Sequence, residues 1–346
     1  MGLKVVITEK NSDISLGDCG RHSSSGIFTE EELRLNRRGI KGPASSDGLS
    51  EASAGSPERA GAITYDALEV LNELGAGSSG SVVRVRHRPT GCCYAMKTLT
   101  KLDEKERRQV LQEVRALHAS SHPSIVGFID AFYADGRVCM LLELMAASLQ
   151  NVVERVGFVP ELVMAKLTEP LLQGLHYLHK TLHIVHRDIK PANILVSAHG
   201  EVKIADFGVS GKLASTIGLK QTFVGTATYM SPERILGTPH SSNADIWSLG
   251  LTLMECALGR YPYGQCDTFF LLLDLIQESP SPSLPADQFS PEFQAFIDSC
   301  LIKDHLARPT ADTLLRHPLI LKTRADTDTN VSGWFIHSII NDTNQV

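Results

Sequence analysis

The sequence predicts an α+β protein of two lobes, a small β-rich lobe followed by a larger, mainly helical one. The first observation is a change in periodicity. Alternating apolar runs occupy about residues 68–99 and 125–144, whereas apolar spacings of three and four residues dominate after Ser148. The second observation is length. An ordinary domain has roughly 100–200 residues, whereas 346 residues are enough for one large domain of two lobes with terminal segments.

Composition and charge exclude several classes of protein. The chain is 42% hydrophobic with a net charge of −6, so no global basic field draws it to nucleic acid or acidic lipid. Its seven cysteines form no CxxC pair, which predicts neither a zinc site nor a disulfide framework. The apolar runs are shorter than the ~20 residues of a membrane span. We expect a monomeric, intracellular chain in the cytoplasm and also in the nucleus, without nucleic-acid or membrane partners.

Residues 1–64 are predicted to form a flexible segment with a regulatory or docking role. They are rich in Ser, Gly and charged residues, and the stretches 42–48 and 53–57 combine serine with glycine and proline. No hydrophobic core is expected there.

The small lobe is predicted at about residues 65–145. Apolar runs separated by turn residues such as Pro89-Thr90-Gly91 are typical of antiparallel strands. One amphipathic helix interrupts them between Lys101 and His118, where apolar residues recur at helical spacing among charges. The predicted strands are Leu68–Leu74, Ser81–Val85, Cys93–Leu99, Ile125–Ala131 and Val138–Leu144.

The large lobe is predicted at about residues 146–320. Its apolar residues follow helical spacing, most clearly over Leu162–Leu178 and Ala244–Leu258. Residues 321–346 remain as a C-terminal tail.

A glycine-rich stretch separates the first two predicted strands. Glycines let a hairpin backbone approach phosphate groups and present N–H groups to them. A GxGxxG pattern also opens dinucleotide-binding βαβ units, but these need a helix directly after the third glycine, and Val82–Val85 is predicted as strand. The candidate phosphate-binding residues are Gly75, Ala76, Gly77 and Gly80.

Lys97 lies in an apolar strand, where an unpaired ammonium group would be costly. Glu113, in the middle of the predicted helix beside Val110 and Val114, is the expected partner. Such a pair would aim Lys97 at the α- and β-phosphates of ATP.

The stretch from His186 to Asp206 carries the residue types that phosphoryl transfer requires. Asp188 would accept the proton of the substrate hydroxyl, and Lys190 would offset charge on the moving phosphoryl group. Asn193 and Asp206 offer hard oxygen ligands and would hold Mg²⁺. ATP and Mg²⁺ are therefore the expected cofactors.

These residues resemble a eukaryotic protein kinase over about residues 65–320, which implies the bilobal kinase fold with one regulatory helix in the small lobe. The resemblance includes Ser231-Pro232-Glu233, with Arg308 as the ion-pair partner of Glu233, and the segment Asp245 to Gly250 as the central helix. Lys190 is typical of serine/threonine kinases. The resemblance implies that the residues meeting adenine are the hinge from Glu143 to Met145, with Leu142 as gatekeeper and with Val82, Ala95 and Leu195 around the ring.

Residues 208–213 and 222–234 closely resemble the activation segment of MAP kinase kinases. The tail around Gly333-Trp334-Phe335 is similar to that family's docking region for the upstream kinase. The resemblance implies a dual-specificity enzyme that phosphorylates Thr and Tyr in the activation loop of a MAP kinase, and that an upstream MAP kinase kinase kinase activates.

Activation in that family uses two phosphorylated hydroxyls of the activation loop. Thr216 and Thr222 have the five-residue gap of the plant-type pattern, and Ser215 competes with Thr216 as the first site. A phosphate on Thr222 would pair with Arg187 and order the loop.

Two alternatives remain open. One is another serine/threonine kinase of the same cascade, against which the Thr216 and Thr222 pair and the Trp334 tail argue. The other is a catalytically silent scaffold, against which the intact catalytic set argues. Arg37-Arg38 beside Leu33 and Leu35 combines the basic and aliphatic residues of a MAP-kinase docking motif, although their order differs from it. The alternative is a solvated charged stretch, which is the more common role of such a run.

Overall fold

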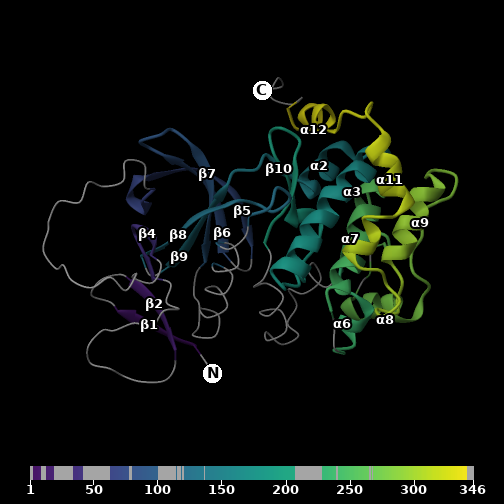
Figure 1. Ribbon diagram of the computed structural model, residues 1–346, viewed down its shortest axis with the longest axis horizontal. Coiled ribbons are helices and arrows are strands. Elements are labelled where there is room, and N and C mark those ends of the chain that lie inside the picture. The colour runs from purple at the N-terminus through teal and green to yellow at the C-terminus, as the bar shows by residue number, and fades with distance from the viewer. Residues whose placement is uncertain are drawn as a thin grey trace, which may run out of the picture. The chain divides into compact units, whose positions relative to one another are not determined.

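The computed structural model describes residues 3–8, 13–18, 34–41, 63–77, 80–99, 114, 118, 121–135, 137–206, 228–238, 241–264, 266 and 268–340. The chain divides into two compact units (Figure 1). The first consists of residues 1–120 and 127–144, and the second of residues 121–126 and 145–346. A β-sheet unit and a helical unit are what the bilobal α+β prediction requires, so that prediction is confirmed.

The first unit contains a five-stranded antiparallel sheet in the order β5-β6-β7-β9-β8, preceded by the 3₁₀ turn η1 (Tyr65–Ala67). The strand predicted from Ile125 begins at Phe128, because Ile125 forms an isolated parallel bridge with Ile204 instead. The other predicted strands are confirmed within a few residues at their ends. The strands are β5 (Leu68–Gly77), β6 (Gly80–His87), β7 (Cys93–Leu99), β8 (Phe128–Ala134) and β9 (Arg137–Glu143).

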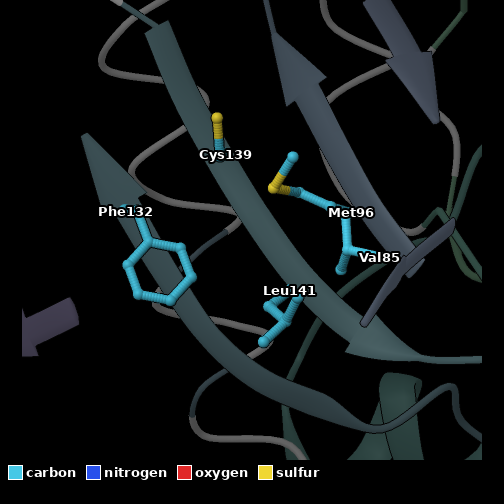
Figure 2. Packing of buried hydrophobic residues seen from close by; sticks show 5 residues of the cluster. All are labelled: Val85, Met96, Phe132, Cys139 and Leu141. Carbon is cyan, nitrogen blue, oxygen red and sulfur yellow. The ribbon is translucent and has the colours of Figure 1, made fainter. Parts of the chain in front are cut away.

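The two faces of this sheet differ. Directly opposed residues share a face, and the side chains along a strand alternate between faces. Val85 of β6, Met96 of β7, Phe132 of β8, and Cys139 and Leu141 of β9 are all buried on one face, and Figure 2 shows their side chains gathered there. Val82, Ala95 and Lys97, which are expected to meet the nucleotide, lie on the opposite face.

The helix predicted between Lys101 and His118 falls mostly outside the described residues. Within that range the structure describes Val114, which is buried, and His118, and both are helical. Glu113 lies outside the described residues, so its pairing with Lys97 stays a prediction.

Residues 3–41 differ from the expectation of a segment without regular structure. Four short strands pair there as an antiparallel sheet, and β-branched residues such as Val5 and Val6 favour strand in spite of the neighbouring Ser and Gly. The strands are β1 (Leu3–Thr8), β2 (Asp13–Asp18), β3 (Arg34–Asn36) and β4 (Gly39–Lys41).

Arg37, in the turn between β3 and β4, is bound within the first unit. Its guanidinium forms ion pairs with Asp66 and Asp135 and lies 5.3 Å over the ring of Tyr65. The Tyr65 N–H donates to the Arg37 carbonyl at 2.9 Å. Arg37 is therefore engaged inside the chain, and its use in a docking motif stays a prediction.

The second unit is mainly helical. The predicted helices at Leu162–Leu178 and Ala244–Leu258 are confirmed, the first ending in a π-helical turn, η2 (Tyr177–Thr181). The α-helices are α2 (Leu149–Val156), α3 (Glu161–His176), α6 (Pro232–Ile235), α7 (Asn243–Leu258), α8 (Phe269–Glu278), α9 (Pro291–Cys300), α10 (Ala311–Leu314), α11 (Pro318–Ala325) and α12 (Val331–Ile340). Among the described residues, no helix combines the length and the apolar character needed to cross a bilayer.

Helix α7 is the buried centre of this unit, because its sequence is apolar almost all round. It ends at Gly259, whose φ of +71° is the left-handed conformation that suits glycine, and a Cβ there would collide with the carbonyl of Gly157. The few polar residues of α7, among them Asp245, Ser248 and Glu255, bind the loops beside the helix.

A small antiparallel sheet lies beside the helices, and the candidate metal-binding residues Asn193 and Asp206 lie at the ends of its β11–β12 hairpin. The 3₁₀ turn η3 (Pro191–Asn193) leads into it, and Ala205 and Asp206 follow it. Its strands are β10 (Ala147–Ser148), β11 (Ile194–Val196) and β12 (Val202–Ile204).

The C-terminal segment to residue 340 is folded onto the second unit. Phe335 of α12 is fully buried, and the Lys166 ammonium on α3 donates to the carbonyl of Asp326 at 2.6 Å. Gly200, in the turn between β11 and β12, has φ of +78°, and a Cβ there would collide with Ser332. Helix α12 therefore packs against the turn of the hairpin that carries Asn193 and Asp206 at its ends.

Candidate active site

The glycine-rich stretch forms a hairpin between β5 and β6, in which Gly77 pairs with Gly80 and Ala76 with Ser81. Gly80 has φ of +143°, and a Cβ there would collide with the carbonyl of Thr98, whereas Gly75 has open space around it. A strand follows Gly80 directly, which excludes the dinucleotide-binding alternative because that requires a helix.

Val82, Ala95, Lys97 and Leu142, four of the residues expected around the nucleotide, share one face of the five-stranded sheet. Val82 lies opposite Lys97, and Ala95 lies opposite Leu142, so the register places these side chains together. Lys97 is only 5% exposed. A buried ammonium on an apolar strand fits a role in binding phosphate, and that role stays a prediction.

The remaining expected nucleotide contacts lie on both sides of the unit boundary, and each is placed within its own unit. Glu143 ends β9 in the first unit. Met145 and Leu195 belong to the second unit, where both are half-buried and Leu195 pairs with Ser148.

Asp188 is held by the two residues predicted to act with it. The Lys190 ammonium donates to both carboxylate oxygens of Asp188, at 3.1 and 2.9 Å. The Asn193 amide donates to the Asp188 carboxylate and to its backbone carbonyl, each at 2.8 Å. The carboxylate is therefore fixed in direction, as a group that must accept a proton from a substrate hydroxyl requires.

The loop before Asp188 is fixed by the buried carboxylate of Asp245. That carboxylate accepts the backbone N–H groups of His186 and Arg187, each at 2.8 Å, and bonds the His179 ring at 2.8 Å. Arg187 has φ of +71°, an uncommon conformation that these bonds stabilise. Burial alone would raise the pKa of Asp245, but its bonds to His179 and the main chain hold that pKa below its ordinary value.

His186 links Asp188 to the segment that carries Asp206. Its Nδ1 accepts the Asp188 backbone N–H at 3.2 Å, so its Nε2 carries the proton that is donated to the carbonyl of Ala205 at 2.9 Å. This is the neutral imidazole, in agreement with burial, which lowers the pKa of His186. The sequence offered His186 as part of the motif but did not indicate this bridging role.

Asn193 and Asp206 fit the binding of a divalent cation. The amide nitrogen of Asn193 points to Asp188, so the amide oxygen points away from Asp188. The amide oxygen is the atom that would bind a metal ion. The Ala205 N–H donates to the Asn193 carbonyl at 2.9 Å, which ties the chain before Asp206 to Asn193. An amide oxygen and a carboxylate are hard ligands of the kind that Mg²⁺ takes.

The predicted phosphorylation sites Ser215, Thr216 and Thr222 lie outside the described residues. The structure does describe where the chain leaves that segment. Tyr229 donates to the carboxylate of Glu255 at 2.5 Å, and the Ser248 hydroxyl donates to the Tyr229 carbonyl at 2.7 Å.

Tyr229 and Glu255 are functional candidates that the sequence reasoning missed. The signal available was Glu255, a carboxylate near the end of a mainly apolar helix. Because α7 carries both Asp245 and Glu255, one helix fixes the loop before Asp188 and the end of the activation segment.

Glu233 and Arg308 form the ion pair that the resemblance implies. The guanidinium makes two hydrogen bonds with the carboxylate, at 2.8 and 3.1 Å, and lies 5.2 Å over the ring of Trp247. Burial by itself opposes ionisation, but Arg308 holds the pKa of Glu233 below its ordinary value.

A cavity of about 450 Å³ lies between the end of α2 and helix α12. Trp334 is part of its wall, which joins this cavity to the predicted docking region. The residues that line it are Arg155, Val156, Phe158, Pro160, Trp334, His337 and Ser338.

Comparison with known proteins bears on the function of this arrangement. Residues 68–320 match the family model described as a protein kinase domain. The chain is 41% identical to Mitogen-activated protein kinase kinase 1 of Arabidopsis thaliana over 323 residues, which cover 90% of each chain. It is 38% identical to Mitogen-activated protein kinase kinase 1c of Physcomitrium patens over 332 residues, 93% of this chain and 94% of that protein. It is 41% identical to Dual specificity mitogen-activated protein kinase kinase dSOR1 of Drosophila melanogaster over 305 residues, 80% of this chain and 76% of that protein.

Proposed function

The chain belongs to the protein kinase family and, within it, to the MAP kinase kinases, and from that membership we propose that it transfers the γ-phosphoryl group of ATP to a Thr and a Tyr in the activation loop of a MAP kinase. An upstream kinase would switch it on by phosphorylating Thr222 and either Thr216 or Ser215. The similarity to an insect relative whose name includes dual specificity supports the tyrosine half of this proposal.

The observation that carries the proposal is the arrangement around Asp188. A silent scaffold has no need of a carboxylate aligned by both Lys190 and Asn193, with its loop fixed by Asp245. Phosphoryl transfer needs such an arrangement, because its catalysis is mostly positioning and electrostatic stabilisation.

Each residue has a distinct part in the proposed reaction. Asp188 orients the substrate hydroxyl and accepts its proton, while Lys190 stabilises negative charge on the phosphoryl group. Asn193 and Asp206 would hold Mg²⁺, which when bound offsets the charge of the phosphates. Lys97 would hold the α- and β-phosphates from the face that it shares with Val82.

The test is phosphoryl transfer to a panel of catalytically inactive MAP kinases. The enzyme carries Thr216→Glu and Thr222→Glu to replace the activating phosphates. We expect transfer to both the Thr and the Tyr of one substrate loop, measured separately with Thr→Val and Tyr→Phe substrates. Asp188→Ala in the same enzyme should remove transfer to both.

The possible outcomes separate the parts of the proposal. Transfer that survives Asp188→Ala would exclude Asp188 as the base. Transfer to Thr alone would contradict dual specificity, and transfer to no member of the panel would contradict the substrate class.

We infer further that the cavity beside Trp334 receives an apolar side chain of the upstream kinase. Its wall combines the aromatic rings of Phe158 and Trp334 with the basic group of Arg155. Phe158 is 56% exposed, so an apolar side chain that enters the cavity can also cover Phe158.

The docking proposal is tested with chains made inactive by Asp188→Ala, as substrates of an upstream kinase. Trp334→Ala should raise KM for this phosphorylation about tenfold or more. Ile336→Ala is the matched control, because Ile336 lies on the same helix, is 38% exposed and does not line the cavity. Equal effects of the two changes would contradict the docking site.

A further inference from the structure

The peptide group that joins Arg187 to Asp188 is bonded at both of its polar atoms. Its N–H, which belongs to Asp188, donates to Nδ1 of His186 at 3.2 Å. Its carbonyl, which belongs to Arg187, accepts from the guanidinium of Arg234 at 2.8 Å. The first bond stays within one loop, whereas Arg234 lies 47 residues further along the chain. Arg234 therefore links this peptide group to a different element, helix α6.

The conformation of Arg187 explains why this peptide group needs to be held. Its φ of +71° is sparsely populated by residues that carry a Cβ, and such a conformation persists when the surrounding bonds maintain it. A return to negative φ would rotate the peptide group and with it Asp188. Bonds on both sides of Arg187 oppose this rotation, since Asp245 accepts its N–H and Arg234 donates to its carbonyl.

Helix α6 keeps Arg234 in place because the two residues before it are bound elsewhere in the second unit. The Pro232 carbonyl accepts from the side-chain amide of Gln277 on α8 at 2.8 Å. Glu233 forms the buried ion pair with Arg308. A helix of four residues is short, and these two attachments give its last turn a fixed position from which Arg234 can reach the loop.

A guanidinium is a costly group to place here. Arg234 is half-buried, and burial lowers its pKa, whereas the nearby carboxylates of Asp245 and Asp188 act in the opposite direction. An arginine side chain remains charged throughout the physiological pH range. The Arg187 carbonyl therefore receives a charge-assisted hydrogen bond, which is roughly twice as strong as one between neutral groups.

We propose that Arg234 is a positioning residue for phosphoryl transfer: its bond to the Arg187 carbonyl keeps the Asp188 carboxylate directed at the substrate hydroxyl. This rests on the proposed function, because it needs Asp188 to act on a substrate hydroxyl. In this role Arg234 touches neither the nucleotide nor the reacting atoms.

A positioning role predicts a specific kinetic effect. A misplacement of about 1 Å at a reacting group can lower the rate about 100-fold. The binding of ATP and of the MAP kinase depends on other residues, so their half-saturating concentrations should not follow the rate. A loss of folded protein would lower the amount of active enzyme, and rates are therefore expressed per folded chain.

The experiment measures single-turnover transfer to an inactive MAP kinase by the enzyme with Thr216→Glu and Thr222→Glu. Arg234→Met removes the donor and keeps most of the length of the side chain. It should lower the rate constant at saturation about tenfold or more and change the half-saturating concentrations of Mg·ATP and MAP kinase less than about twofold. Arg234→Lys retains a charged donor and should keep at least about a third of the parent rate. Arg316→Met, at an exposed arginine, is the control and should change none of these values.

Arg234→Gln answers the question if Arg234→Met does not fold. Its side chain is polar but too short to reach the Arg187 carbonyl, so its rate should fall as in Arg234→Met. A parent-like rate in Arg234→Met or Arg234→Gln would overturn the proposal, as would a loss in Arg234→Lys equal to that in Arg234→Met. Weaker half-saturation by both substrates with an unchanged transfer rate would overturn it too. A parent enzyme that transfers to no MAP kinase would instead contradict the proposed function.

Discussion

The carboxylate of Asp245 accepts the backbone N–H of Arg187 at 2.8 Å, so helix α7 sets the conformation of the residue directly before Asp188. This bond joins the most buried helix of the second unit to the most reactive loop. It explains how the positive φ of Arg187 is maintained.

Asp245→Asn should therefore reduce both stability and rate. The asparagine amide has one acceptor oxygen where the carboxylate has two. Its NH₂ group would therefore face a backbone N–H donor that the carboxylate accepts. We expect a loss of about 3–5 kcal/mol in the free energy of unfolding, as for other broken buried charge pairs, and a fall in kcat of about 100-fold. Urea unfolding and steady-state kinetics measure the two effects. Asp312→Asn, at a half-exposed carboxylate, is the control.

The buried pair of Glu233 and Arg308 should be far more sensitive than an exposed pair. Arg308→Leu leaves the Glu233 carboxylate buried without its partner and should cost about 3–5 kcal/mol of unfolding free energy. Arg316→Ala, which breaks the exposed pair with Asp312, should cost less than about 1 kcal/mol. Adding Glu233→Leu to Arg308→Leu should recover part of the loss. Equal effects of Arg308→Leu and Arg316→Ala would contradict this account.

Two glycines of the phosphate-binding hairpin should respond differently to alanine. Gly80→Ala imposes a positive φ on alanine and collides with the Thr98 carbonyl, so it should lower the free energy of unfolding by about 2 kcal/mol or more. Gly75→Ala meets open space and should change it by less than about 1 kcal/mol. Thermal unfolding without nucleotide gives the comparison. A greater loss for Gly75→Ala would show that the hairpin has a different backbone.

Stability should fall as the pH is lowered from about 7.5 to 6. Burial lowers the pKa of His122, His186 and His317, so each remains neutral in the folded chain at pH values where the unfolded chain binds a proton. The unfolded state then holds more protons below its ordinary histidine pKa of about 6.5, and the free energy of unfolding rises with pH. Urea titrations across this range should show a positive slope that His122→Gln reduces. A flat or negative slope in the parent would contradict the prediction.

The segment beyond residue 320 should contribute to stability. Phe335→Ala removes a fully buried ring and should cost about 3–5 kcal/mol. Ile336→Ala, next to it but 38% exposed, should cost less than about 1.5 kcal/mol. Thermal or urea unfolding of the two variants distinguishes a packed α12 from a loosely attached tail.

Much of this arrangement could be predicted from the sequence, because local patterns encode it. The alternation of apolar residues marked the strands around Lys97, and helical spacing marked α3 and α7. The order and spacing of Asp188, Lys190, Asn193 and Asp206 indicated phosphoryl transfer before any contact was known. Few other functions require this combination of residue types at this spacing.

Contacts between residues that are far apart in the sequence could not be predicted. Nothing near His179 indicates that it shares the Asp245 carboxylate with the loop before Asp188. The strands within residues 3–41 were missed because serine- and glycine-rich stretches on either side outweighed short runs such as Val5-Val6. The hydrogen bond from the Gly127 N–H to the Glu143 carboxylate depends on strand register, which periodicity alone does not fix.

The packing of Gly200 against Ser332 has an evolutionary consequence. Gly200 lies inside the segment that matches the kinase family, whereas Ser332 lies beyond its end at residue 320. Because a Cβ at position 200 would collide with residue 332, substitutions at the two positions should not be independent. Related chains with a larger residue in the hairpin turn should differ in the first turn of α12 as well, so the catalytic domain and its C-terminal helix are expected to be inherited as a matched pair.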